Sequence, residues 1–91
     1  MALHNVVLKI EEKNISLVVL DESTHIGHDQ WVDENNLLEE FFPRLQSLLE
    51  SNSLSLGDVE RYTLETDIPT GYTMARIAQT LVSTLNFALE T

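Results

Sequence analysis

The chain has 91 residues, of which 43% are hydrophobic and 22% are charged, a balance typical of one globular domain. Fifteen acidic residues against five basic ones give a net charge of −10, which argues against direct binding of nucleic acid. Cysteine is absent, which excludes disulfides and thiolate metal sites. No apolar run reaches the roughly 18 residues that cross a bilayer. The first residues also lack the pattern of a secretory signal, so we expect a cytoplasmic protein without membrane association.

The chain begins with two predicted strands. Residues 6–12 carry an apolar side chain at every second position, which is the pattern of a half-buried strand. The pair Lys13–Asn14 predicts a tight turn into a second strand over 15–20, which is rich in branched residues. These two strands should form a hairpin.

A third strand is predicted over 24–32, after a turn at 21–23. Gly27 within it indicates a bulge, because glycine inside a strand weakens pairing. His25 and His28, with the neighbouring aspartate, suggest zinc. Residues three apart in a regular strand point to opposite faces, so a shared metal would require the bulge. Exposed strand histidines are the simpler interpretation.

Residues 37–50 have the period of an amphipathic helix. Pro43 lies within this segment, so either the helix begins near Pro43 or it is continuous and kinked. A polar connection over 51–58 then leads to a fourth strand over 59–65, and a strand reached through a helix favours parallel pairing by a right-handed crossover. The apolar arc of the helix comprises Leu37, Leu38, Phe41, Phe42, Leu45, Leu48 and Leu49.

The segment "DIPTGYT", residues 67–73, is a polar turn before a last helix predicted up to residue 90, with Thr70 or Thr73 as its N-cap. Such turns can bind phosphate through free N–H groups and the helix dipole. A phosphate cradle needs several glycines, whereas this turn has one glycine, begins with an acid and has no lysine. Helix capping therefore explains the turn, with nucleotide binding over 66–76 as the alternative.

The last helix has almost no charge. Its apolar residues span roughly 160°, wider than the stripe of about 100° that a core requires. Arg76 is its only charged residue before Glu90, although the chain has many acids. We infer a buried contact surface for a protein partner. A helix that is simply well packed in the core is the alternative.

Nothing in the sequence indicates catalysis. Adjacent acids such as Glu11 with Glu12, and Glu39 with Glu40, point apart on a strand or a helix. No Ser–His–Asp spacing, P-loop or dinucleotide fingerprint is present. We therefore predict a non-enzymatic protein without a cofactor, built as a small mixed sheet with helices packed on it.

Residues 42–78 resemble the N-terminal domain of the TsaB family, also called YeaZ. The family's leucine–proline before a helix corresponds to Phe42 and Pro43, and its polar loop before a strand to Leu56 and Asp58. The signature that opens its next helix is matched at Pro69, Tyr72, Thr73, Arg76 and Ile77. The signature's glycines and serine are replaced by Ile68, Thr70, Met74, Ala78 and Gly71. The aspartate–threonine–serine that usually ends the family's first strand is replaced here by Glu11, Glu12 and Lys13.

The resemblance implies an α/β fold of β-β-β-α-β-α order, an actin-like, ribonuclease-H-like half domain. TsaB-like proteins are non-catalytic members of the machinery that makes threonylcarbamoyladenosine on tRNA, and they dimerise or bind a TsaD-type subunit through the two helices of this domain. We therefore expect residues 1–91 to form a single TsaB-like domain that makes a homodimer, or a heterodimer with a TsaD-like partner. The alternatives are a small nucleotide-binding protein and a diverged regulatory paralogue outside this pathway. The predicted interface comprises Phe41, Leu45, Leu48, Met74, Ile77, Ala78, Leu81, Val82 and Leu85.

Overall fold

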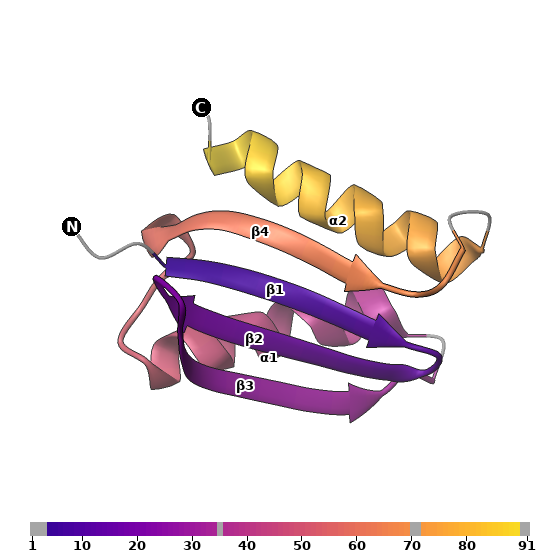
Figure 1. Ribbon diagram of the computed structural model, residues 1–91, viewed down its shortest axis with the longest axis horizontal. Helices are drawn as coiled ribbons and strands as arrows, with labels where there is room; N and C mark the ends of the chain where they lie inside the picture. Colours follow the sequence, from indigo (N-terminus) through magenta and orange to yellow (C-terminus); the bar gives the residue numbers. More distant parts are fainter. Residues whose placement is uncertain (1–3, 35, 70–71, 90–91) are drawn as a thin grey trace.

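The computed structural model describes residues 4–34, 36–69 and 72–89. The order of elements is the predicted one, strand, strand, strand, helix, strand, helix (Figure 1). The elements are β1 (His4–Glu11), β2 (Asn14–Asp21), β3 (Thr24–Val32), α1 (Leu37–Ser51), β4 (Val59–Thr66) and α2 (Thr73–Leu89). Neither helix of the described chain is long and apolar enough to cross a membrane.

The four strands form one mixed sheet in the order β3-β2-β1-β4. β2 pairs antiparallel with both β1 and β3, and β4 pairs parallel with β1. The parallel pair is reached through α1, which confirms the predicted parallel pairing. This is the small mixed α/β sheet expected of an actin-like half domain.

Both hairpin turns contain a residue with positive φ. Glu11 pairs with Asn14, so the first turn is Glu12–Lys13, and the prediction of Lys13–Asn14 is wrong by one residue. Glu12 has φ 57° and Glu22, in the second turn, has φ 58°. Two-residue hairpin turns require such angles because their twist must match that of the strands. Neither turn contains the glycine that would have marked it in the sequence.

A bulge interrupts β3 where Gly27 predicts one. Val19 pairs with Gly27 and Leu20 pairs with His25, which leaves Ile26 as the extra residue. Gly27 faces α1, because a Cβ atom at this position would lie 2.7 Å from the side-chain amide nitrogen of Asn52. Glycine therefore allows α1 to approach β3 closely.

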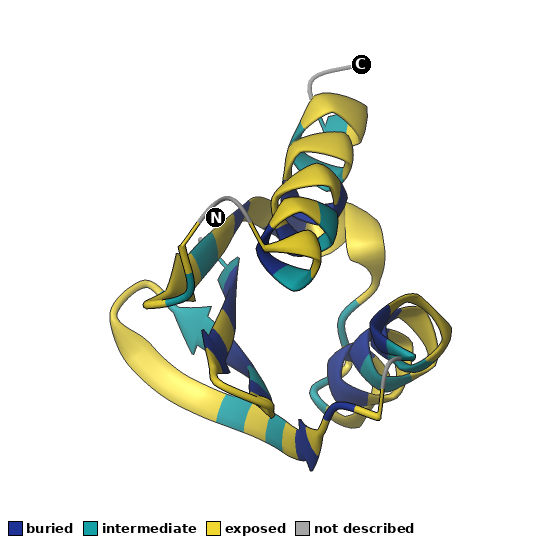
Figure 2. Cartoon of the chain, turned by 90° about the vertical axis from the view of Figure 1, so that its right-hand side faces the viewer, coloured by how far each residue is buried: buried dark blue, intermediate teal, exposed yellow. Residues whose placement is uncertain are grey.

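Both helices lie on the same face of the sheet (Figure 2). α1 is continuous through Pro43, so the helix does not begin there. The core between the helices and the sheet contains alternate residues of the strands together with the inner face of each helix. Its fully buried side chains include Val6, Leu8, Ile10, Ile15, Leu17, Val19, Phe41, Leu45, Leu49 and Val59.

A short 3₁₀ helix, η1 (Leu56–Asp58), lies between α1 and β4 and was absent from the sequence prediction. Ser55 and Asp58 stabilise it as a capping box, in which the Ser55 N–H donates to Asp58 Oδ2 at 2.8 Å. Hydrogen bonds from the Ser55 backbone and then its hydroxyl lower the pKa of Asp58. Three residues are too few to show a helical period, which is why the pattern misses this turn.

Candidate interaction surface on the helical face

The structure divides the nine predicted interface residues into two groups. Met74, Ile77 and Leu85 are partly buried and pack against the core. The remaining six are buried inside the chain: Phe41, Leu45, Leu48, Ala78, Leu81 and Val82. The interface itself stays a prediction, but these six residues hold the helices on the sheet within one chain.

The most apolar groove of the helical face runs between α1 and α2. Leu38 and Phe42, one turn apart on α1, form one wall and are 53% and 45% exposed. Its volume is about 530 Å³. The opposite wall is formed by Thr73, Arg76, Ile77, Thr80, Leu81 and Thr84 of α2.

Leu38 and Phe42 are the residues that the sequence-based interface omits. Phe42 packs edge to face on the buried Phe41, with ring centroids 5.1 Å apart, so its exposed ring is held in place. The feature of the sequence that could have identified them is the width of the apolar arc of α1. A helix that only covers a core has a narrower apolar stripe. Leu38 and Phe42 are the two residues of that arc that the core does not bury.

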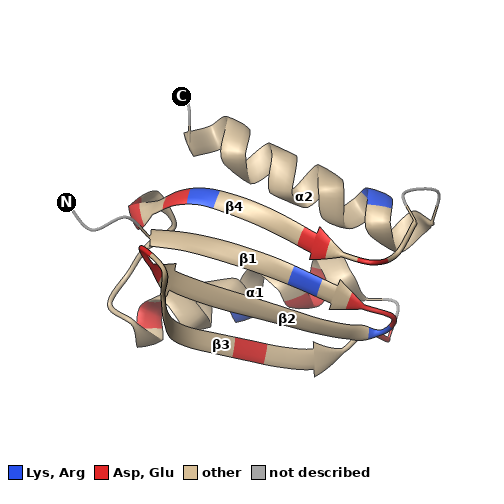
Figure 3. Cartoon of the chain, in the orientation of Figure 1, with Lys and Arg blue, Asp and Glu red and all other residues tan. Residues whose placement is uncertain are grey.

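Charge is distributed unevenly around this groove. Among the described residues, Arg76 is the only charged one that lines it, and it is also the only charged residue of α2 (Figure 3). None of the described acidic residues lines this groove, although the chain has fifteen acids and a net charge of −10. The groove is therefore a nearly uncharged, partly apolar strip on an acidic molecule.

A second cavity of about 340 Å³ continues the groove at the start of both helices. It shares Leu38, Thr73 and Ile77 with the groove. Helix N-termini favour anions, but Asp33 and Glu39 also line this cavity and repel them. The residues that line this cavity therefore do not support a phosphate site.

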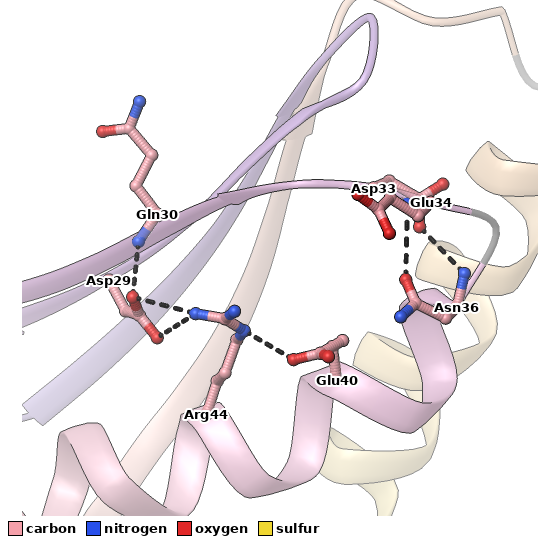
Figure 4. Close-up of polar contacts among 7 residues, drawn as sticks. All are labelled: Asp29, Gln30, Asp33, Glu34, Asn36, Glu40 and Arg44. Atoms are coloured by element: carbon pink, nitrogen blue, oxygen red, sulfur yellow. Dashed lines mark hydrogen bonds and ion pairs between the residues drawn. The ribbon is translucent and has the colours of Figure 1, made fainter.

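Asp33 is the one buried charged residue among the described parts of the chain. Its N–H donates to the Lys13 carbonyl at 2.7 Å, and its Oδ1 accepts from the Asn36 N–H at 3.2 Å. The Glu34 N–H in turn donates to Asn36 Oδ1 at 3.3 Å (Figure 4). These contacts join the end of β3 to the start of α1, so Asp33 has a structural task.

Arg44 fixes the outer side of α1 to β3. Its Nε donates to Glu40 at 2.8 Å, and its Nη1 donates to both carboxylate oxygens of Asp29, at 3.2 and 3.4 Å (Figure 4). Its guanidinium also lies 4.6 Å from the ring centre of Trp31. The hydrogen bond with Glu40 is the largest cause of its raised pKa. This cluster orients α1, and with it Leu38 and Phe42.

The two histidines of β3 do lie on one side of the sheet. The bulge places His25 opposite Leu20 and His28 opposite Val18, and their rings are 5.5 Å apart. Both are exposed. Over residues 4–34, 36–69 and 72–89, no three histidine or carboxylate side chains gather as a metal site would require.

The polar turn before α2 is described only in part, because Thr70 and Gly71 lie outside the described residues. The Ile68 N–H donates to the Thr66 hydroxyl at 3.1 Å, and the Tyr72 N–H donates to the Pro69 carbonyl at 3.1 Å. Thr73 is already the first residue of α2, so it does not precede the helix as the predicted N-cap would.

The sheet order, the parallel pair and the two helices on one face define the class: an actin-like half domain with the fold predicted from the TsaB resemblance. Among solved structures, the chain is similar to YeaZ from Pseudomonas aeruginosa, with a TM-score of 0.81 and 23% sequence identity. A structure described as an uncharacterised protein with similarity to peptidase YEAZ, also from Pseudomonas aeruginosa, gives the same values. Each match covers 97% of this chain and 40% of the other chain. No known protein family and no curated protein matches by sequence.

Proposed function

We propose that this protein is a non-catalytic interaction subunit of the TsaB type, which acts in the modification of tRNA by holding a protein partner on its helical face. The observation that carries the proposal is the groove between α1 and α2, whose walls include the exposed Leu38 and Phe42. The partner is a second copy of the chain or a TsaD-like subunit.

Three observations support this use of the groove. The chain has the fold of part of YeaZ, since the match covers 97% of this chain and 40% of that protein. The described residues that line the groove include no acid, on a molecule that carries fifteen, so a partner would avoid desolvating carboxylates there. Its lining combines apolar side chains with threonines, and protein interfaces commonly combine apolar and polar contacts in this way.

The experiment is light scattering with the purified chain, alone and mixed with a TsaD-like protein from the same source. We expect a stable dimer in at least one of the two samples. A chain that stays a monomer in both, at concentrations up to 100-fold above those at which the folded state is verified by circular dichroism, would overturn the proposal.

The Leu81→Glu variant separates packing from association. Leu81 is 7% exposed and belongs to the core, so an unpaired charge there should lower the free energy of unfolding by about 3 kcal/mol or more. Urea denaturation followed by circular dichroism measures this change. A Leu81→Glu chain of wild-type stability that has only lost its partner would mean that Leu81 is part of the interface and not of the core.

A further inference from the structure

The bulge in β3 sets the direction of the two histidines on this strand. In a regular strand, residues three apart point to opposite faces of the sheet. The bulge adds Ile26 as an unpaired residue. His25 is opposite Leu20 and His28 is opposite Val18, so the two histidines lie only two positions apart along β2. Both imidazoles therefore point to the same face of the sheet.

This face is the one that points away from the helices. Gly27, which precedes His28, faces α1, since a Cβ atom there would lie 2.7 Å from the side-chain nitrogen of Asn52. Successive residues of a strand point to opposite faces, so His28 points away from α1, and His25 with it. Both histidines are exposed. A ligand held by them leaves the groove between α1 and α2 accessible.

The two rings have the separation of imidazoles that share one metal ion. Their centres are 5.5 Å apart and their planes meet at 76°. A histidine nitrogen binds zinc at about 2.0–2.1 Å, so two imidazoles on one ion have their centres roughly 4.5–6 Å apart, depending on the angle at the metal. The folded chain therefore already holds this pair close to the distance that chelation requires.

The two nitrogen ligands define the class of ion. Imidazole suits late first-row transition metals such as zinc, nickel and copper, whereas calcium and magnesium prefer oxygen ligands. The described parts of the chain bring no third histidine or carboxylate to the pair, so water would complete the coordination of the ion. The net charge of −10 also favours the approach of a cation.

We propose that His25 and His28 form a site that holds a divalent late transition-metal ion through two imidazoles, and that the bulge of β3 builds this site. Both ligands come from one strand on the face opposite the helices. The inference is therefore independent of the interface proposed between α1 and α2.

Titration calorimetry with Ni²⁺ as the probe tests the two ligands. We expect one ion per chain. His25→Asn and His28→Asn should each weaken binding at least about tenfold, because a single imidazole loses the gain in effective concentration that the pair provides. His4→Asn is the matched control, because it removes the third histidine of the chain, which lies at the start of β1, and it should bind as the unmodified chain does. No binding to the unmodified chain, or equal binding by all four proteins, would overturn the proposal.

A peptide tests the part played by the fold. A terminally blocked peptide of sequence THIGHDQW, residues 24–31, carries both histidines without the sheet. Ordering its two rings around the ion costs conformational entropy, which the folded chain has already lost. Ni²⁺ should therefore bind the peptide at least about tenfold more weakly than the protein. Equal affinity for the two would overturn the proposal, since the bulge would then contribute nothing to the site.

Discussion

Tyr62 is the buried residue whose ionisation should lower the stability of the fold most. Its side chain is 3% exposed, and this burial raises its pKa from 10.0 to about 12. Burial therefore favours the neutral form of Tyr62 in the folded state. The contribution of Tyr62 to folding stability is fully present below pH 10 and is lost as the pH rises towards 12. We expect the free energy of unfolding to fall by about 2 kcal/mol over this interval.

The Tyr62→Phe variant isolates this effect from other groups that titrate at high pH. The Tyr62 hydroxyl makes only a long contact of 3.5 Å with the Leu56 carbonyl, so its loss at pH 8 should cost less than about 0.5 kcal/mol. Urea denaturation at pH 8, 10, 11 and 12 measures both proteins. If the free energy of unfolding depends on pH in the same way for both proteins across this range, Tyr62 does not ionise differently in the folded state.

At the scale of elements, the approach of α1 to β3 depends on Gly27. A Cβ atom there would displace the side chain of Asn52, whose Nδ2 donates to the Leu48 carbonyl at 2.9 Å. Gly27→Ala should therefore lower the free energy of unfolding by about 1 kcal/mol. In an Asn52→Ala background the same substitution should cost less than about 0.5 kcal/mol, since no amide is left to displace. Equal costs in the two backgrounds, measured by urea denaturation, would place the strain elsewhere.

Periodicity was sufficient to predict most elements and their order. Alternation marked the strands, and the helix between β3 and β4 favoured a parallel pair, because parallel strands are joined by a crossover connection. The prediction of the first turn was wrong by one residue. The positive φ of the turn at Glu12–Lys13 falls on a glutamate, so no glycine marked its position. η1 was too short to leave a pattern, and its signal was only the Ser55–Asp58 capping pair.

At the scale of the whole molecule, the sequence predicts a contact surface on the helices but does not show which of their residues face outward. A helical wheel shows which residues share a side, whereas burial depends on how far apart two helices settle on the sheet. Here α1 and α2 leave a groove, so Leu38 and Phe42 stay exposed while Phe41 and Leu45 are covered. The residues on which a partner would rest are thus those at the margin of the predicted arc.

The exposed groove residues should affect association without affecting folding. Phe42→Glu changes a side chain that is 45% exposed and lies outside the core, so the free energy of unfolding should change by less than about 1 kcal/mol. A buried aromatic anchor typically contributes more than about 1.4 kcal/mol to binding, so the dissociation constant should rise at least about tenfold. Leu56→Glu is the matched control, because Leu56 is also 45% exposed and lies outside the groove.

Sedimentation of the unmodified chain, Phe42→Glu and Leu56→Glu, each alone and with a TsaD-like protein, is the most direct test of the helical-face interface. We predict that Phe42→Glu weakens the complex at least about tenfold while Leu56→Glu assembles as the unmodified chain does. A complex that forms equally well with Phe42→Glu, in a chain whose fold is intact, would contradict an interface in the groove between α1 and α2.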